Sequence, residues 1–534
     1  MLLRSLLLGV VCWVAVAQVR YEDILKSPNE NWLTYAGDYR ANSLSPLRQI
    51  TPENVNTLTS KWSFKVPKAN GLRTRPLAVG GVLYFTNTNS IYALDAKSGR
   101  QIWQFVDTQV KKEAVNRGLA ILGDKVYFVT ADCHLVALDR RTGGILWRSK
   151  YGNVEDGLFA SAAPLAINGR IVVGVAGGDT GMRGYVAAMD AETGKELWRT
   201  YTIPAKGEKG SETWGNYIEY GGGGTWLSGT YEAETDTLYW TTGNPWPDFY
   251  GGDRKGDNLY TCSLLALDGK TGKMKWYFQF TPHDWHDWDA QSWPVIADVT
   301  YEGKPRKVVF HANRNGFLYV LDRTTGQYLR SSKLVDLLDW ASGIDAKGRP
   351  IEVPGKNPTP EGNRVCPGVQ GATNWYGQSW NASLGLLYVI TFEQCDVFTS
   401  SSKEPEPKKS FSGGGAGPKP NDKGSFYLRA INPLTGERRW EYKMTGGGGM
   451  WAGIIGTATG VIFSGDDDGH LIALDAKTGK HLWHYQTGEQ MYASPITYMV
   501  DGKQYVSIAS ATAIHTFGLF EPVVSVPVAP RRIE

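Results

Sequence analysis

The chain has 534 residues, including 63 Gly, 20 Trp and 27 Tyr, and 20% of its residues are charged. This composition excludes a disordered, collagen-like or coiled-coil protein. Lys and Arg total 56 against 53 for Asp and Glu, so the formal charge of +3 gives no broad attraction for nucleic acid or acidic membranes. The many Gly and aromatic residues indicate short strands joined by tight turns in one large all-β domain.

The first 17 residues have the features of an export signal. Arg4 precedes an uncharged run of 13 residues, 5–17, that ends in the small-x-small pattern Ala15-Val16-Ala17. A retained membrane anchor is the alternative, but at about 1.5 Å per residue this run is too short to cross roughly 30 Å of hydrocarbon. We therefore predict that residues 1–17 are removed and that the mature protein, which has no later apolar span, lies in the periplasm or outside the cell.

One short pattern recurs along the chain. Ala-x-Asp-x-x-x-Gly-x-x-x-Trp first occurs with Asp95, Gly99 and Trp103. The acidic or amide positions of the later copies are Asp139, Asp190, Asp268, Asp322, Asn432 and Asp475. The copy at Asp322 has Leu329 near the place of the Trp. Each copy predicts a strand, a tight turn and a second strand, with the Trp packing against a neighbour.

The spacing of the copies predicts a β-propeller. The intervals are 44, 51, 78, 54, 110 and 43 residues, and the shorter ones match one four-stranded blade. The 110-residue interval has room for a degenerate blade, which we place around residues 380–392. Seven copies and this one predict eight blades over residues 18–520. We expect residues 31–64, including Trp62, to close the ring by pairing with the last strands near residues 505–517.

Some segments lie outside the repeat. Residues 400–423 are rich in Ser, Lys, Pro and Gly and are predicted to form a mobile surface loop, and residues 521–534 are predicted to form a disordered tail. Cys133 and Cys262 lie in strand-like sequence and are expected to be buried. Cys366 and Cys395 could form a disulfide or stay free, because the sequence does not give their separation.

Glycine and acidic residues are concentrated in the longer intervals. Gly221–Gly224 precede Trp226, and Asn244 stands in a Gly-Asn-Pro sequence. Residues 283–289 then place acidic and imidazole side chains around two Trp residues, Trp285 and Trp288. Extra length on one face of a propeller lines its central funnel, which favours a functional site. The alternative interpretation is a set of solvated loop charges and Asx turns.

With these motifs the sequence resembles the pyrroloquinoline quinone (PQQ)-dependent alcohol dehydrogenases, which are eight-bladed periplasmic quinoproteins. The resemblance extends from Trp32 to about Ala513, and the repeat resembles the family's tryptophan-docking motif. Asn116-Arg117-Gly118 resembles a cofactor-contact motif of the family. The cofactor-binding residues that the resemblance implies are Arg117, Ser161, Gly177, Gly178, Trp226, Arg314, Asn374 and Trp451. Cationic, hydroxyl and aromatic groups suit PQQ because it is a flat tricarboxylate.

The resemblance also implies a metal site and a catalytic base. The implied metal ligands are Asp179, Asn244, Asp287 and Asp289, and Asp287 is also the implied general base. Oxygen ligands suit a hard cation, which would activate the quinone as a Lewis acid. Asp289 resembles the additional acid of lanthanide-using members, so one lanthanide ion is favoured over calcium, the alternative. Asp179 stands where the family usually has the longer Glu.

The sequence departs from the family at two places. Lys111 and Lys112 stand where many members have two adjacent Cys, and Arg73 stands where an acid often contacts the cofactor. No CxxCH motif for haem attachment occurs, so the resemblance implies a separate electron acceptor, a periplasmic cytochrome c. The expected reaction is oxidation of a small alcohol. Two alternatives stay open: a non-catalytic exported propeller for assembly or sensing, and a quinoprotein that oxidises a sugar or an amine.

Overall fold

A computed structural model of the chain describes residues 18–522 except 113, 216–217, 404–409, 420–421, 423 and 447–450. The predicted signal peptide and residues 523–534 of the predicted tail lie outside the described residues. The described part is almost entirely β-structure, with one short α-helix, α1 (Tyr21–Leu25). No helix in this part is long and apolar enough to cross a membrane.

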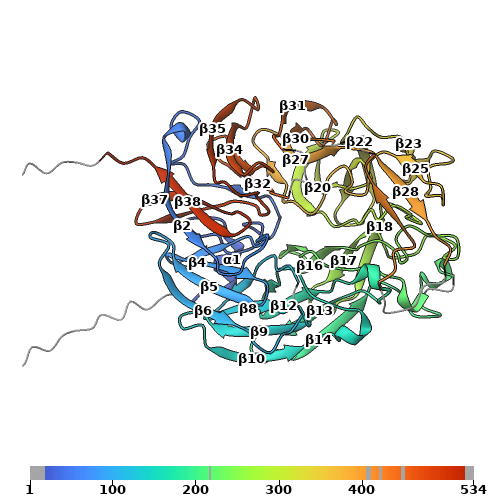
Figure 1. Ribbon diagram of the computed structural model, residues 1–534, viewed down its shortest axis with the longest axis horizontal. Helices are drawn as coiled ribbons and strands as arrows, with labels where there is room; N and C mark the ends of the chain where they lie inside the picture. The colour runs from blue at the N-terminus through green and yellow to red at the C-terminus, as the bar shows by residue number, and fades with distance from the viewer. Residues whose placement is uncertain are drawn as a thin grey trace, which may run out of the picture.

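The described strands build sheets that follow one another around a ring in chain order (Figure 1). The first sheet contains β3 (Leu77–Val79), β4 (Val82–Asn87), β5 (Ser90–Asp95) and β6 (Gln101–Val106). The second contains β7 (Ala120–Leu122), β8 (Lys125–Val129), β9 (His134–Asp139) and β10 (Ile145–Lys150). The third contains β11 (Leu165–Ile167), β12 (Arg170–Gly174), β13 (Tyr185–Asp190) and β14 (Glu196–Tyr201). The fourth contains β15 (Thr230–Glu232), β16 (Thr237–Thr241), β17 (Ser263–Asp268) and β18 (Met274–Gln279).

Four more sheets complete the ring. The fifth contains β19 (Val295–Tyr301), β20 (Lys304–Ala312), β21 (Phe317–Asp322) and β22 (Tyr328–Lys333). The sixth contains β26 (Ser379–Asn381), β27 (Leu386–Glu393), β30 (Ser425–Ile431) and β31 (Arg438–Lys443). The seventh contains β1 (Leu44–Ser45), β32 (Ile454–Thr457), β33 (Val461–Gly465), β34 (His470–Asp475) and β35 (His481–Gln486). The closing sheet contains β2 (Leu58–Lys65), β36 (Ile496–Val500), β37 (Lys503–Ala509) and β38 (Ala513–Leu519).

The recurring sequence pattern forms the last turn of each of the first seven sheets. In six of them, the glycine of this turn contacts the Trp of the preceding sheet. Asp95 accepts hydrogen bonds from the backbone and hydroxyl of Ser98, which closes the turn after β5. The Trp62 indole lies on Gly99 and donates to the Ala96 carbonyl at 3.2 Å. A Cβ on Gly99 would come within 2.6 Å of that ring, so only glycine leaves room for it. Trp103 contacts Gly143 of the second sheet in the same way.

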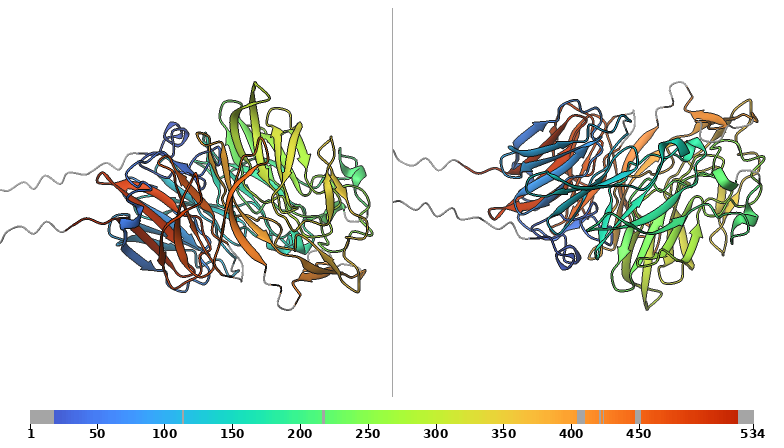
Figure 2. Two further views of the ribbon diagram at one scale, coloured as in Figure 1. Left: turned by 90° about the horizontal axis from the view of Figure 1, so that it is seen from above. Right: turned by 90° about the horizontal axis from the view of Figure 1, so that it is seen from below.

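The expected pairing of the two ends of the chain is confirmed. Strand β2 pairs antiparallel with β38, from Leu58 opposite Leu519 to Lys65 opposite Ala513. The first and last coloured segments therefore lie side by side in Figure 1, and the views in Figure 2 show the same contact from the edge of the ring. This pairing leaves no gap between the first sheet and the seventh.

The predicted degenerate blade around residues 380–392 is wrong as a separate unit. Strands β26 and β27 of that segment belong to the same sheet as β30 and β31, which carry the copy at Asn432. Residues 394–424 leave the sheet between its two inner strands, so one unit occupies far more sequence than the others. Two segments outside the ring, one before β26 and one between β27 and β30, also form a two-stranded sheet and a three-stranded sheet. Their strands are β23 (Ala341–Ile344) and β24 (Pro350–Glu352), and β25 (Asn363–Val365), β28 (Asp396–Ser400) and β29 (Gly414–Gly417).

Two further expectations concern the same region. Part of residues 400–423 forms β29, which pairs with β28, while the mobility expected of this segment stays a prediction. Cys366 and Cys395 are joined by a disulfide, which decides between the two possibilities that the sequence left open. Cys133 and Cys262 are free and buried, as expected.

Candidate active site

A cavity of about 240 Å³ lies where loops from several sheets meet. Its volume is somewhat below the range of about 300–1,000 Å³ that is typical of small-molecule sites. It is lined by Val115, Arg117, Phe159, Ser161, Ala176, Gly177, Gly178, Asp179, Gly224, Trp226, Asn244, Asp287, Asp289 and Arg314. Ten of the site residues expected from the sequence are in this lining, whereas Asn374 and Trp451 are not. Segments far apart in the sequence therefore converge on one site.

Arg117 is a buried cation in the wall of the cavity. Its guanidinium lies over the rings of Trp226, at 4.7 Å, and Trp375, at 4.9 Å. It donates to the Ser161 hydroxyl at 2.8 Å, but its buried Nε has no hydrogen-bond partner. Burial lowers the pKa of Arg117 to about 10, and no acid in the described residues forms an ion pair with it. This environment suits a ligand that brings a carboxylate.

Asp289 connects three other members of the site. One carboxylate oxygen accepts the backbone N–H of Asn244 at 2.6 Å. The other accepts the indole N–H of Trp226 at 3.1 Å and a guanidinium N–H of Arg314 at 3.0 Å. Burial raises the pKa of Asp289. Since its oxygens already accept three hydrogen bonds, Asp289 fixes the positions of its neighbours as well as adding negative charge.

Arg314 lies between two carboxylates. Its Nη2 is 3.6 Å from Asp287, and the same nitrogen donates to the Val369 carbonyl at 2.5 Å. Gly371 packs directly on Arg314, where a Cβ would come within 2.5 Å of the arginine side chain. Burial lowers the pKa of Arg314, but the nearby carboxylates of Asp287 and Asp289 raise it by more, so Arg314 remains charged.

The loop that carries Asp287 is held in an uncommon conformation. Asp287 has a φ of 58°, in the left-handed region that is rare for residues with a side chain. Asp284 accepts the backbone N–H of His286 at 3.2 Å and that of Trp288 at 3.0 Å, on either side of Asp287. The indole of Trp288 donates to the Gly368 carbonyl at 3.0 Å. Such strain, about 1–3 kcal/mol, persists only where surrounding contacts enforce it.

The carboxylates repel one another in a water-poor environment. Burial and the neighbouring Asp289 raise the pKa of Asp179 to about 6, and burial raises the pKa of Asp287 well above its usual value. A bound cation would relieve both effects. In the described part of the chain, no three His, Cys, Asp or Glu side chains gather closely enough to hold an ion alone. An ion here would therefore need the amide of Asn244 and oxygens from a ligand, which the cavity has room to admit.

Sequence reasoning missed one residue that supports the site. Asp248 is 4% exposed and accepts a hydrogen bond from the Asn244 side-chain amide at 2.7 Å. Its signal was its position four residues after Asn244 in a turn rich in Pro and Trp. Trp375, which forms with Asn374 a pair that resembles a cofactor-contact motif of the family, contacts Arg117. Asn374 instead donates to the Gln370 carbonyl at 2.8 Å.

The departures from the family pattern also have definite places. The Lys112 ammonium lies 4.8 Å from the ring centre of Phe159, which lines the cavity. Arg73 lies over Tyr492 at 5.4 Å and does not line this cavity. Trp451 stacks on Trp375 with ring centres 6.3 Å apart, behind the cavity wall.

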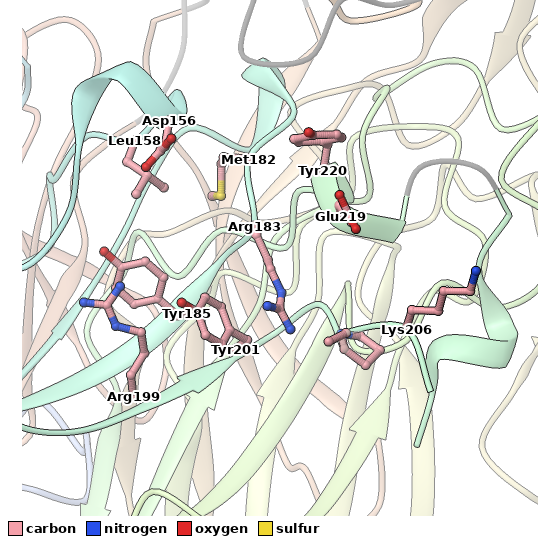
Figure 3. A pocket seen from close by; sticks show the side chains of 12 residues that line it. Asp156, Leu158, Met182, Arg183, Tyr185, Arg199, Tyr201, Lys206, Glu219 and Tyr220 are labelled. Atoms are coloured by element: carbon pink, nitrogen blue, oxygen red, sulfur yellow. The ribbon is translucent and has the colours of Figure 1, made fainter. Parts of the chain in front are cut away.

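A second cavity, of about 370 Å³, lies beside the third sheet (Figure 3). It is larger, but two of its cations, Arg183 and Arg199, are already engaged. Arg183 lies over Tyr201 at 3.9 Å, and Arg199 lies over Tyr185 at 4.0 Å and pairs with Glu196 at 2.6 Å. This cavity lacks the converging carboxylates of the smaller one, which is therefore the better candidate for chemistry.

Comparison with known proteins agrees with this geometry. Residues 32–331 and 439–506 match the PQQ family described as glucose/ethanol/alcohol dehydrogenase, β-propeller domain. The quinoprotein alcohol dehydrogenase PedH of Pseudomonas putida is 35% identical over 531 residues, covering 93% of this chain and 89% of the relative.

Two solved structures have the same fold. The quinohemoprotein alcohol dehydrogenase of Comamonas testosteroni has a TM-score of 0.86 and 33% identity, covering 92% of this chain and 80% of that one. A europium-containing methanol dehydrogenase has a TM-score of 0.86 and 30% identity, covering 93% of this chain and 100% of that one. The fold is therefore that of a quinone-dependent β-propeller dehydrogenase. The chain belongs to the family of PQQ-dependent quinoprotein alcohol dehydrogenases.

Proposed function

We propose that this chain oxidises a small alcohol to an aldehyde, with PQQ as hydride acceptor and one bound metal ion. When bound, the quinone supplies an electrophilic carbon, and a cation on its oxygen makes that carbon a better acceptor. The observation that carries the proposal is a single cavity that holds an indole, three carboxylates and the buried Arg117 guanidinium, which forms no ion pair among the described residues. Family membership supports it independently.

The rim and floor of the cavity would hold the cofactor. Arg117 and Ser161 would bind a carboxylate, and Trp226 would provide the aromatic floor. Gly177 and Gly178 would allow close approach of the cofactor to the backbone. Asn374 and Trp451, which lie outside the lining, would support the cofactor site through Trp375. Asn374 precedes Trp375 in the chain, and Trp451 stacks on it.

Asp287 would act as the general base. It would accept the proton of the alcohol hydroxyl while the carbinol carbon loses its hydride, so that an aldehyde results. Burial raises the pKa of Asp287, and a bound cation would lower it again, so that the carboxylate is deprotonated and free to accept this proton. Arg314, 3.6 Å from Asp287, would orient the carboxylate and lie beside the quinone oxygens.

Asp179, Asn244, Asp287 and Asp289 would ligate the metal ion. Three carboxylates favour a trivalent ion by electrostatics, so we propose a lanthanide, with calcium as the alternative. The europium-containing methanol dehydrogenase among the similar structures supports this choice. Asp289 also accepts three hydrogen bonds and so connects its neighbours. This structural role must be tested separately from metal binding.

We further propose that the eight sheets of the ring are propeller blades connected by tryptophan docking. The Trp62 and Trp103 contacts support this assignment. We also propose that residues 1–17 direct the protein to the periplasm, where a separate cytochrome c would accept the electrons. The pattern of residues 1–17 and the lack of a CxxCH motif in the 534 residues support these two steps.

The test is reconstitution of the purified chain with PQQ and either lanthanum or calcium, followed by alcohol-dependent dye reduction. Wild type is compared with Asp289→Asn, which keeps the shape and removes the charge, and with Asp289→Ala. Lanthanum-dependent turnover that both variants lose is the expected result. Calcium-dependent turnover that survives in Asp289→Asn would reject the lanthanide assignment. Absence of quinone binding with either metal would reject the dehydrogenase assignment.

A further inference from the structure

A buried carboxylate, Asp248, lies directly behind Asn244 and outside the cavity lining. Asn244 and Asp248 are 3% and 4% exposed. The Asn244 Nδ2 donates to the Asp248 carboxylate at 2.7 Å and more weakly to the Pro245 carbonyl at 3.3 Å. An amide has its oxygen and nitrogen on opposite sides, so fixing Nδ2 also fixes where Oδ1 points. That oxygen faces Gly178, where a Cβ would come within 3.3 Å of it.

Among the described residues, no Lys or Arg side chain forms an ion pair with Asp248, although Arg254 donates to the carbonyl of the adjacent Pro247 at 3.0 Å. Asp179, Asp287 and Asp289 all lie close enough to act on it electrostatically, and all three carry the same sign. Its hydrogen bond comes from a neutral amide. A buried carboxylate surrounded by like charges is costly unless a cation compensates it. The neighbouring cavity is where such a cation would bind.

The backbone around Asp248 is held from a distant segment. The Phe249 N–H donates to the Ser412 carbonyl at 2.8 Å, and the Phe411 N–H donates to the Asp179 carbonyl at 3.2 Å. Phe411 also packs edge-on against the buried Trp246, with ring centres 6.4 Å apart. Residues 411–412 therefore connect the loop of Asp248 to the loop of Asp179, and the carboxylate of Asp248 is kept at Asn244.

We propose that Asp248 is a positioning residue that directs the Asn244 amide oxygen into the cavity and whose negative charge increases the preference for a trivalent over a divalent ion. This inference rests on the proposed metal site. The hydrogen bond accounts for the orientation of the ligand, and the charge accounts for the selectivity. The two contributions are separable, because Asn at this position keeps an acceptor oxygen and loses the charge.

The selectivity has a defined size. The Coulomb energy between a fixed charge and an ion is proportional to the charge of the ion. When one negative charge is removed, the binding energy that a trivalent ion loses is therefore about 1.5 times the binding energy that a divalent ion loses. If calcium binds about tenfold more weakly to Asp248→Asn, lanthanum should bind about 30-fold more weakly.

The experiment is calorimetric titration of the full-length, quinone-loaded protein with lanthanum chloride and with calcium chloride. Wild type, Asp248→Asn and Asp248→Ala are compared. Asp466→Asn is the matched control, because it changes another buried Asp, in the seventh sheet, that does not line the cavity. Thermal unfolding without added metal shows that each variant is folded.

We expect Asp248→Asn to weaken lanthanum binding more than calcium binding, and Asp248→Ala to weaken both ions by about 10- to 100-fold because the amide also loses its partner. Wild-type affinity in both variants would overturn the inference. Equal weakening of the two ions in Asp248→Asn would overturn the charge contribution. If wild type binds neither metal, the proposed metal site fails, and this inference fails with it.

Discussion

Single residues in the cavity divide into a cationic side and an acidic side. Among the described residues, Arg117 has aromatic and hydroxyl neighbours and forms no ion pair, whereas Asp287 and Asp289 share Arg314. Burial lowers the pKa of Arg117 and raises the pKa of Asp287, because burial disfavours the charged form of either group. The site therefore suits a ligand that places an anionic group at Arg117 and binds a cation together with Asp287 and Asp289.

Asp287→Asn tests the base. The amide keeps the size of the side chain but cannot accept a proton, so we expect turnover to fall by about 10²- to 10⁴-fold. Quinone binding, followed by absorbance, should remain because Arg117, Ser161 and Trp226 are unchanged. Turnover within twofold of wild type would show that another group removes the alcohol proton.

Metal affinity should depend on pH through Asp179. Burial and Asp289 raise the pKa of Asp179 to about 6, and a metal binds only the deprotonated carboxylate. Protons therefore compete below about pH 6, and lanthanum affinity should fall as the pH decreases from 7 to 5. Titration of wild type at both pH values measures this change. An affinity that is constant over the range would contradict the role of Asp179.

Among the elements, the loop of residues 283–289 is held in place by several hydrogen bonds. Asp284 accepts the N–H groups of His286 and Trp288 and so holds Asp287 at its positive φ. The segment closed by the Cys366–Cys395 disulfide supports it from the other side, since Gly368 accepts the indole N–H of Trp288. The precision of the site is thus supplied by irregular loops that are attached to regular sheets.

Asp284→Ala should weaken both the loop and the enzyme. Two buried N–H groups lose their acceptor, which costs about 1–3 kcal/mol for each unsatisfied group. We expect a lower free energy of unfolding in urea and lower turnover, with Asp284→Asn intermediate because it keeps one acceptor oxygen. If the Ala variant matched wild type in both measurements, the loop would be held by other contacts.

For the whole molecule, the contact between neighbouring sheets and the pairing of the two chain ends act together. Trp62 belongs to β2, which pairs with β38, and its indole covers Gly99 of the first sheet. One side chain thus joins the closing sheet to the start of the ring. Loss of this contact should weaken the closure of the ring as well as local packing.

Trp62→Ala should reduce the free energy of unfolding by about 3–5 kcal/mol, the usual range for removing a large buried aromatic side chain. Trp62→Phe is the matched control. It fills most of the space but loses the hydrogen bond to Ala96, so its cost should be about 1 kcal/mol from that bond, plus a smaller packing loss. Equal costs for Ala and Phe would mean that the ring contact contributes little.

The sequence predicted the features that depend on local pattern. The strand-turn-strand units, the pairing of β2 with β38 and the burial of Cys133 and Cys262 follow from periodicity, turn residues and composition. The degenerate blade was misplaced because repeat spacing cannot show that residues 394–424 leave a sheet and that the chain then returns to it.

Within the candidate site, the sequence predicted the residues that resemble family motifs, and ten of them line one cavity. It did not predict Asp248 or the role of Asp284, because their contacts are with backbone and amide groups whose positions depend on the folded loops. It also could not show that Asn374 lies outside the cavity lining and donates to Gln370, since side-chain contacts depend on tertiary packing.

The most direct test of the proposed function is a crystal structure of the protein with PQQ and lanthanum, with the ion located by its anomalous scattering. We predict one strong peak bounded by Asp179, Asn244, Asp287 and Asp289, with the quinone stacked on Trp226 and a carboxylate at Arg117. Quinone bound elsewhere, or an ion that does not contact these four side chains, would contradict the proposed metal-assisted alcohol oxidation at this site.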